Sequence, residues 1–293
     1  MMNRIITITT SILCFTASVF LTPVMAQDTN PDNNLVWAGC GITKKAFMQE
    51  LANGFEQKTG IEFKLEGGGA TRGVRDAAKL KVDVGGSCRI TLPNTDSSEL
   101  HVTMNPVAWD ALAIIVHPSN PVSTLTMDQI RNIYEGKVNN WNQLGGPDKA
   151  LKLFVRTGKI SGVGYAIRQY IFEDAEKDFV TEHIFRSSGP LEKAVEADPE
   201  SIGITGISSA RKRNVKVIGF NGMEPTFENV RDGNYGLYRP LFLVTGPKPT
   251  KDVKAFLAFA TSEEGKQIIR DNQTVPYHDA LHLVSKMLIY GLN

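Results

Sequence analysis

The chain has 293 residues, with 32 Lys and Arg against 31 Asp and Glu, and it contains three cysteines. A formal net charge of +1 gives no basic excess of the kind that binds nucleic acid. The length exceeds what one small hydrophobic core usually holds, so we expect two lobes.

The first 26 residues have the pattern of a secretory signal peptide. Arg4 precedes a largely apolar run over 5–21, and the segment 24–26 offers a cleavage site after Ala26. The alternative is a membrane anchor, but threonines and serines dilute the run and no later segment approaches membrane-spanning length. We therefore predict a periplasmic protein whose mature form keeps 31 basic and 31 acidic side chains and two cysteines.

The mature sequence then alternates between short apolar strands, glycine-bearing turns and helices. Three strand-and-turn units follow one another, at 35–38 with 39–43, at 61–65 with 67–73, and at 82–84 with 85–89. The first two turns lead into amphipathic helices that end near Gly60 and Leu80. This alternation predicts a parallel sheet with helices on both faces, and ligands of such sheets gather at the carboxyl ends of the strands, where the turns lie.

A long apolar run at 107–116 is suited to a strand that crosses into a second lobe, and Pro118 and Pro121 end it. The elements expected after it are a capped helix at 126–135, a strand at 152–155, a helix through 167–171, strands at 202–205 and 215–218, a returning strand at 240–245, and helices at 253–259 and 263–270. Two crossings predict a hinge. Lobe 1 would then comprise 27–112 plus 241–293, and lobe 2 would comprise 113–240.

The glycine run at 67–69 is the most informative segment for function. A glycine-rich turn between a strand and a helix presents backbone N–H groups that bind oxyanions, and a plain turn explains the segment equally well. No Gly-Lys-Ser/Thr ends the run, and Arg72 stands where a dinucleotide fingerprint needs glycine. A nucleotide site is therefore disfavoured.

Taken in order, these motifs resemble the periplasmic phosphate-binding component of ABC transporters, within the type II periplasmic binding protein superfamily. The segments that carry the resemblance are 39–43, 67–73, 82–89, 133–136, 140–141, Arg156 with Ser161 and Gly162, 201–204, 237–241 and 262–265. The resemblance implies a two-lobe α/β fold, with mixed sheets, helices on both faces and two crossover strands as a hinge. It further implies a monomer without cofactor or enzymatic activity, which closes over a small oxyanion and hands it to a membrane permease.

The resemblance also implies ligand contacts, position by position. Thr43 with the N–H of Lys44 matches a contact at the start of the first helix, and Arg156 matches an arginine that clamps the anion from the second lobe. An arginine fork gives charge-assisted bonds, while a surface salt bridge is the alternative for Arg156. The full set of expected ligand positions is Thr43, Lys44, Ala70, Thr71, Arg72, Cys88, Arg89, Arg156, Ser161, Gly162 and Val163.

Three of these positions depart from the family pattern. Val163 stands where members often have threonine, and Ala70 where serine is common. Cys88 falls where relatives have aspartate or serine, and an aspartate there would accept the proton of hydrogen phosphate and repel sulfate. Phosphate selectivity thereby loses its usual physical basis. We hypothesise that Cys88 tunes ligand choice away from plain phosphate.

Cys40 and Cys88 end the first and third strands, which are expected to be neighbours in this fold, about 4.8 Å apart. In an exported protein such a pair is interpreted first as a disulfide, which would stiffen the cleft. Two free thiols that bind a soft ion such as arsenite, zinc or copper(I) are a second interpretation. An inert packed pair is the third.

Two other patterns have a functional and a structural interpretation. His278 and His282 are four apart on an expected C-terminal helix, a spacing that suits a metal, but no third ligand is evident and no metal site is predicted. Trp109 and Trp141 have the chemistry to stack on a sugar, but core packing is the commoner use of tryptophan.

The leading hypothesis is a receptor that captures phosphate or a similar oxyanion for ABC-type transport. A sensor of the same fold, which binds an oxyanion or a soft metal or arsenite and signals to a membrane partner, needs the same cleft and hinge. A thiol enzyme using Cys40 and Cys88 lacks a Cys-x-x-Cys motif and an evident base. No Gly-x-Ser-x-Gly elbow or compact catalytic cluster supports hydrolysis.

Overall fold

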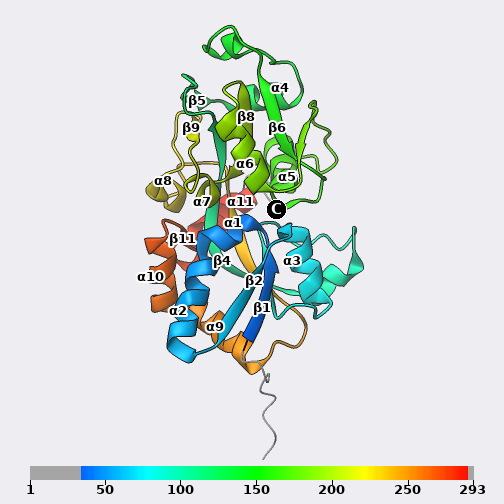
Figure 1. Ribbon diagram of the computed structural model, residues 1–293, viewed down its shortest axis with the longest axis vertical. Helices are drawn as coiled ribbons and strands as arrows, with labels where there is room; N and C mark the ends of the chain where they lie inside the picture. Colours follow the sequence, from blue (N-terminus) through cyan, green and yellow to red (C-terminus); the bar gives the residue numbers. More distant parts are fainter. Residues whose placement is uncertain (1–33, 290–293) are drawn as a thin grey trace, which may run out of the picture. The chain divides into compact units, whose positions relative to one another are not determined.

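The computed structural model describes residues 34–289, so the signal peptide predicted at 1–26 lies outside the described residues. The strands form one continuous sheet in the order β2-β1-β3-β10-β4-β8-β6-β7, which passes from a first lobe into a second (Figure 1). Within 34–289, no helix is both long and apolar enough to cross a membrane.

The first lobe is built on a mixed sheet. Its parallel strands are β2 (Glu62–Glu66), β1 (Asn34–Gly39) and β3 (Val84–Ser87), and β10 (Tyr238–Thr245) runs antiparallel to β3. The strand β4 (Thr103–Val116) pairs with β10 on one side and with β11 (Val275–Pro276) on the other. The predicted pairing of the first and third strands is confirmed, with Gly39 opposite Gly86.

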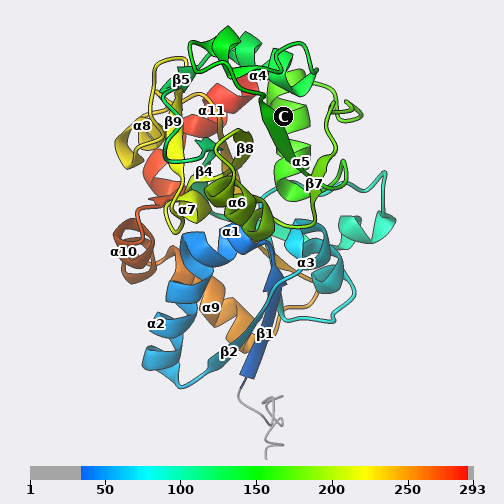
Figure 2. The ribbon, with the colours of Figure 1, turned by 45° about the horizontal axis from the view of Figure 1, so that its top comes forward.

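Helices cover both faces of this sheet. Both faces are apolar, since successive side chains of β1 belong to two different apolar clusters on opposite sides. Leu35 and Trp37 belong to the larger cluster, and Ala38 belongs to the smaller one beneath α3. The helices of this lobe are α1 (Gly41–Thr43), which continues through a π-turn (Lys44–Met48) into α2 (Gln49–Thr59), then α3 (Gly69–Ala78), α9 (Lys251–Thr261) and α10 (Glu263–Asp271), with short 3-10 turns at Ser97–His101 and Tyr277–Ala280. The last helix, α11 (His282–Ile289), lies beside the second lobe (Figure 2).

The second lobe has its own mixed arrangement. The strand β6 (Lys152–Arg156) lies between β7 (His183–Phe185) and β8 (Ser201–Gly206), parallel to both. The remaining elements are β5 (Thr124–Leu125), β9 (Lys216–Phe220), α4 (Met127–Tyr134), a 3-10 turn (Trp141–Leu144), α5 (Gly162–Ile167) with a π-turn (Arg168–Phe172), α6 (Ser188–Ala197), α7 (Ile207–Ala210) and α8 (Phe227–Arg231).

Two chain crossings join the lobes. The strand β4 pairs with β10 through Ala111 and with β8 from Leu112 onward, so one strand belongs to both sheets. The returning chain lies directly beside it, since the Leu112 N–H donates to the Leu237 carbonyl over 2.8 Å. Figure 2 shows α1 and α3 of the first lobe facing α6 and α7 of the second at this junction. The two-lobe fold expected from the sequence is confirmed.

Two predicted boundaries were wrong at the glycines. The third strand, expected at 82–84, is β3 at Val84–Ser87 and therefore contains Gly85 and Gly86. A Cβ at Gly86 would lie 2.2 Å from Trp37 Cζ2, so this glycine permits close packing inside the sheet instead of making a turn. The second helix, expected to follow a turn at 67–73 and to end near Leu80, begins at Gly69 inside that turn and ends at Ala78.

The C-terminal histidines do not share a helix as expected. His278 lies in a 3-10 turn, and His282 is the first residue of α11. Among the described residues, no group of three or more His, Cys, Asp or Glu could hold a metal ion. Trp109 and Trp141 are both buried in the core. Their indole N–H groups are satisfied there, since Trp109 donates to the Tyr277 carbonyl and Trp141 donates to the Glu200 carbonyl.

Candidate functional site

A cavity of about 240 Å³ opens where the two lobes face each other. The first lobe lines it with Cys40, Gly41, Ile42, Lys45, Gly67, Gly68, Gly69, Ala70 and Cys88. The second lobe lines it with Arg156, Gly162, Val163, Ser187, Ser188, Gly189, Ser209 and Arg213. Cationic and small residues dominate this surface, and no carboxylate is among them.

Four helices begin at the cavity wall. The first residues of α1, α3, α5 and α6 all line it, and α1 and α5 each continue without a break into a further helical turn. The first N–H groups of a helix have no partner inside the helix, and the helix dipole adds partial positive charge there. Helix starts from both lobes therefore present N–H donors to one enclosed space.

The glycine run makes the start of α3 available to the cavity. Gly68 and Gly69 have φ of +132° and +88°, values that other residues rarely adopt, so the chain turns sharply from β2 into the helix. A Cβ at Gly69 would meet nothing within 4 Å. The anion-binding interpretation of this run agrees with its position at the cavity.

Arg156 projects from the end of β6 into the cavity wall. Its Nη1 donates to Ser188 Oγ over 3.0 Å, and its Nη2 donates to the Arg186 carbonyl over 2.8 Å. Its Nε is buried and has no hydrogen-bond partner within the described chain. Burial lowers the pKa of Arg156, but the ordinary pKa of a guanidinium lies so far above neutral pH that the side chain stays charged. Arg156 makes no ion pair with a described carboxylate, which argues against the salt-bridge alternative.

Two more cations are held at the cavity by one buried carboxylate. Lys45 of the first lobe and Arg213 of the second each pair with Glu192 Oε2, at 3.3 and 3.2 Å. Glu192 Oε1 accepts bonds from Thr205 and Ser209, and although burial raises the pKa of Glu192, these bonds and the nearby cations lower it overall. The ionised Glu192 therefore fixes the cations and links the lobes.

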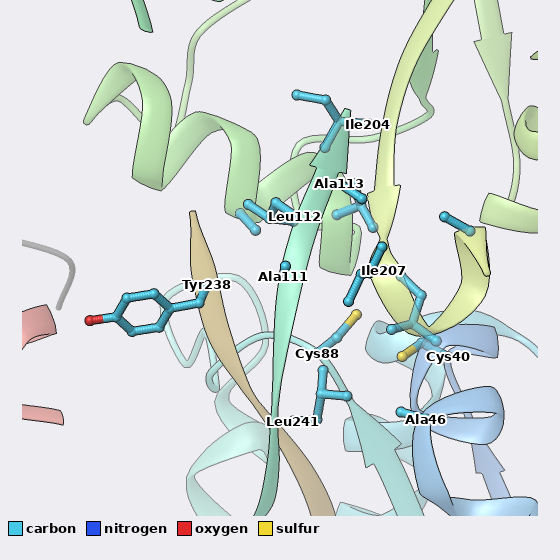
Figure 3. Packing of buried hydrophobic residues seen from close by; sticks show 14 of the residues in the cluster. Cys40, Ala46, Cys88, Ala111, Leu112, Ala113, Ile204, Ile207, Tyr238 and Leu241 are labelled. Atoms are coloured by element: carbon cyan, nitrogen blue, oxygen red, sulfur yellow. The ribbon is translucent and has the colours of Figure 1, made fainter. Parts of the chain in front are cut away.

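Cys40 and Cys88 lie side by side at the cavity as free thiols (Figure 3). The disulfide expected between them is not formed in this structure. Burial raises the pKa of Cys40, but hydrogen bonds from Cys88 and Thr43 and the charge of Arg239 outweigh it and lower that pKa to about 6. The hydrogen bond to Cys40, burial and the charge of Cys40 all raise the pKa of Cys88. The two shifts are opposed, so Cys40 is the member of the pair that loses its proton more readily.

Arg239 of β10 lies behind the cavity wall and contacts the backbone of two lining residues. It is fully buried, and its Nη1 donates to the carbonyls of Cys88 and Gly162 over 3.2 and 3.1 Å, one from each lobe. Its Nη2 lies 3.8 Å from Asp110 Oδ2. Burial raises the pKa of Asp110, while Arg239 opposes that shift.

Comparison with known proteins identifies the family to which this fold belongs. A family model described as a PBP superfamily domain matches residues 29–264. The chain belongs to the PBP superfamily. Among curated relatives of this PBP chain, the phosphate-binding protein PstS of Borreliella burgdorferi is 28% identical over 173 residues, which is 56% of this chain and 62% of that relative. The PstS of Bacillus subtilis is 26% identical over 248 residues, covering 84% of this chain and 81% of that one.

Solved structures agree with the family assignment. A putative phosphate ABC transporter substrate-binding protein with bound phosphate from Clostridium perfringens is 27% identical, with a TM-score of 0.76 over 83% of this chain and 99% of that chain. An ABC-type phosphate transport receptor from Vibrio cholerae is 26% identical, with a TM-score of 0.64 over 82% and 99%. The predicted family and fold class are confirmed.

Only part of the ligand set expected from the resemblance lines the cavity of this PBP chain. The positions that do are Ala70, Cys88, Arg156, Gly162 and Val163, and those that do not are Thr43, Lys44, Thr71, Arg72, Arg89 and Ser161. The Thr43 hydroxyl donates to the Cys40 carbonyl, and the Ser161 hydroxyl donates to the Gly158 carbonyl. Arg72 is turned outward, where it pairs with Glu66 and Asp76.

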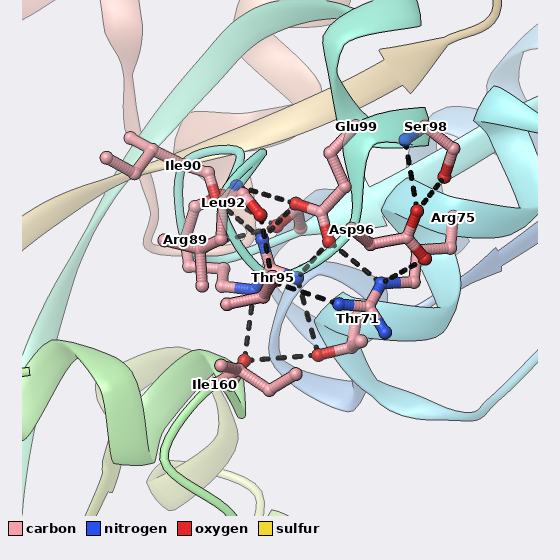
Figure 4. Close-up of polar contacts among 11 residues, drawn as sticks. Thr71, Arg75, Arg89, Ile90, Leu92, Thr95, Asp96, Ser98, Glu99 and Ile160 are labelled. Atoms are coloured by element: carbon pink, nitrogen blue, oxygen red, sulfur yellow. Dashed lines mark hydrogen bonds and ion pairs between the residues drawn. The ribbon is translucent and has the colours of Figure 1, made fainter. Parts of the chain in front are cut away.

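Arg89 and Thr71 join the lobes instead of lining the cavity (Figure 4). Arg89 forms a two-bond ion pair with Glu99, at 2.8 and 3.0 Å, and neither side chain is exposed. The Nε of Arg89 and the hydroxyl of Thr71 both donate to the Ile160 carbonyl of the second lobe, over 3.0 and 3.1 Å. The buried pair therefore positions Arg89 for a contact that joins the two lobes of this PBP chain.

Glu99→Gln is expected to destabilise the fold by about 2–3 kcal/mol at pH 7, because Arg89 loses its buried counter-charge. Burial raises the pKa of Glu99, but bonds from Arg89 and the Leu92 N–H outweigh it and hold that pKa below its ordinary value of 4.5. The carboxylate therefore stabilises the fold above that pH and loses its effect as pH falls further. Urea unfolding from pH 7 to pH 3 should show the gap to the unmutated protein closing.

Glu264→Gln is the matched control for that experiment, since Glu264 forms an exposed pair with Lys58. It should change stability by less than about 0.5 kcal/mol at every pH. A gap for Glu99→Gln that stayed constant down to pH 3 would contradict the assignment of a depressed pKa.

Gly162→Ala is expected to force the PBP lobes apart at the cavity. A Cβ on Gly162 would lie 2.3 Å from Cys88 Sγ and 3.1 Å from Ala70 Cβ, both in the first lobe. Such overpacking typically costs about 1–3 kcal/mol, and adding Cys88→Ala should restore most of it. Thermal unfolding measures both effects. Gly41→Ala is the control, because a Cβ there meets nothing within 4 Å, and an equal loss in the control would rule out the steric explanation.

Lys45, Ser188, Ser209 and Arg213 line the cavity but were not predicted from the sequence. Ser187 and the first two residues of α6, Ser188 and Gly189, form a run of small residues after β7, the same kind of signal that marked the other turns. Neither β7 nor α6 was predicted, so that junction had no context. Nothing local distinguishes Lys45 or Arg213 from an ordinary surface cation.

Proposed function

We propose that the chain is an exported, non-enzymatic receptor that binds phosphate in the interlobe cavity and delivers it to an ABC permease. The observation that carries this proposal is the convergence of four helix starts and the Arg156 guanidinium on one cavity of about 240 Å³. Fixed N–H donors and a guanidinium fork satisfy the oxygens of a dehydrated anion without mobile counter-ions.

The charge of the cavity supports an anionic ligand. Arg156, Lys45 and Arg213 line it, and Glu192 is the one carboxylate that directly pairs with any of the three in the described chain. The unpartnered Nε of Arg156 leaves one buried donor for a ligand oxygen. These features favour phosphate over a neutral solute.

The relatives support the same ligand. The two PstS proteins bear the name phosphate-binding protein, and the Clostridium perfringens structure contains bound phosphate at 27% identity over 83% of this chain. We extend that ligand to this chain, with a permease as the partner that receives it. Delivery to a transporter also accounts for the export predicted from residues 1–26 and for a periplasmic location.

Binding is favoured over catalysis by what the cavity lacks. Its lining residues include no histidine and no carboxylate, so a bound water has neither of these general bases among them. Both walls of the cavity come from the same chain, so a monomer is enough to form the binding site.

We propose that the lobe formed by 27–112 and 241–293 moves against the lobe formed by 113–240 when the ligand enters and leaves.

Isothermal titration of the mature protein, unfolded and refolded to remove carried ligand, tests the proposal. Saturable binding of inorganic phosphate with a Kd in the micromolar range or below is expected, and sulfate at the same concentrations serves as the comparison anion. No binding of phosphate between pH 6 and pH 8 by a correctly refolded protein would overturn it. Tighter binding of sulfate than phosphate would keep the anion site but reject phosphate as its ligand.

A further inference from the structure

The two thiols at the cavity are a feature that the transport function does not use. Cys40 and Cys88 are only 6% and 2% exposed, yet both contribute to the cavity surface. They are also the only cysteines that remain in the chain after residue 26. In an exported protein, a free pair of this kind meets an oxidising environment.

The backbone brings the pair within reach of a disulfide. Gly39 of β1 pairs with Gly86 of β3, and the N–H of Cys40 donates to the Gly86 carbonyl over 3.2 Å. Adjacent strands are about 4.8 Å apart, and disulfides join residues whose Cα atoms are roughly 4.4–6.8 Å apart. Cys40 directly follows β1, Cys88 directly follows β3, and both side chains line the same cavity.

The surroundings of Cys40 favour its thiolate form. The Thr43 N–H donates to Cys40 Sγ over 3.4 Å, and the Thr43 hydroxyl lies 3.2 Å from the same sulfur. The charged and titratable groups that act on the pair from other elements are Arg239, Asp110, Arg156 and Tyr170, and Lys45 lies on the helix that follows Cys40. A thiolate is the form that attacks disulfides.

We propose that Cys40 and Cys88 form a reversible redox pair, and that its oxidation to a disulfide strengthens anion binding in the cavity. The second half of this inference rests on the proposed function, while the first half does not. The oxidant is a disulfide, carried by a small molecule or by another protein of the oxidising compartment, and a small disulfide serves for the exchange below.

The exchange balances in two steps. The Cys40 thiolate attacks one sulfur of the small disulfide, forms a mixed disulfide and releases one thiolate. Cys88 then loses its proton to solvent and attacks Cys40 Sγ, which forms the Cys40–Cys88 bond and releases the second thiolate. Two electrons pass to the small disulfide, and the protein loses the charge of the Cys40 thiolate and the proton of Cys88.

Electrostatics sets the direction of the effect on the ligand. In the reduced protein the Cys40 thiolate offsets the positive charge of Arg239 and repels an anion in the cavity. A disulfide is neutral, so the cavity becomes more positive by about one charge. One charge within several ångströms in partly buried surroundings changes an affinity by about tenfold or more.

The experiment compares phosphate affinity of the reduced and oxidised mature protein at pH 8 and at pH 5. Oxidised glutathione converts the pair, dithiothreitol restores it, and thiol titration with intact mass measures the conversion independently of any ligand. About tenfold tighter binding is expected for the oxidised protein at pH 8. At pH 5, below the Cys40 pKa of about 6, both forms are neutral at this site and should bind alike. Phosphate changes its own protonation equally in both forms.

Three results overturn parts of the inference separately. Two free thiols after oxidant, or a stable glutathione adduct, would overturn the redox pair. A formed disulfide with unchanged affinity at pH 8 would overturn the link to binding. Absence of phosphate binding in both forms would overturn the proposed function and leave the thiol result intact. Cys40→Ser is the control, which has neither the bond nor the thiolate and should show no oxidant-dependent gain in affinity, and the comparison within the unmutated protein stands even if that variant misfolds.

Discussion

Arg156→Met is expected to weaken phosphate binding by about two to three orders of magnitude. The variant keeps the length and apolar stem of the side chain but loses the charge and the buried Nε donor that faces no partner in the described chain. A hydrogen bond to a charged group contributes roughly 1.5–3 kcal/mol, and a guanidinium usually makes two to an oxyanion. Isothermal titration with phosphate at pH 7 measures the loss.

The matched control for this variant is Arg231→Met. Arg231 is on α8, where it is exposed and paired with Asp232, and it does not line the cavity. The control should bind phosphate as the unmutated protein does. Arg156→Lys should recover a small part of the affinity, because an ammonium keeps the charge but not the fork. A change of less than threefold in Arg156→Met, with unchanged circular dichroism, would remove Arg156 from the ligand site.

The alternation of strands, turns and helices was predictable from the sequence because each signal is local. Leu35, Trp37 and Ala38 alternate between two faces, and this period of two predicts a strand wherever the fold places it. The capped helix expected at 126–135 is α4, in which Thr126 and Gln129 make the reciprocal bonds of a capping box. Pairing of the first and third strands followed from the family resemblance.

The details of the site were less predictable because they depend on contacts between distant residues. Gly85 and Gly86 look like a turn in sequence, and only the Trp37 side chain packed against them explains why they lie inside β3. Arg89 matches a ligand position by order, but Glu99 draws it into a buried ion pair. Lys45 becomes a cavity cation because Glu192, almost 150 positions later, holds it there.

Arg239→Met is expected to destabilise the fold by about 3–5 kcal/mol. Arg239 is fully buried, and its removal leaves the carboxylate of Asp110 in the interior with its nearest cation gone. Burial already raises the pKa of Asp110, and without the opposing charge of Arg239 that pKa should rise further. Urea unfolding at pH 7 measures the loss.

A double-mutant cycle separates this electrostatic cost from the loss of packing. Asp110→Asn removes the buried charge while keeping an oxygen that can accept the bond from the Ser208 N–H, and the double variant should therefore recover about 2 kcal/mol over Arg239→Met alone. The portion that stays lost reflects the bonds from Arg239 to the carbonyls of Cys88 and Gly162, which tie the two lobes to the same side chain. Strictly additive losses in the cycle would mean that Arg239 stabilises the junction through those carbonyls alone, with no contribution from Asp110.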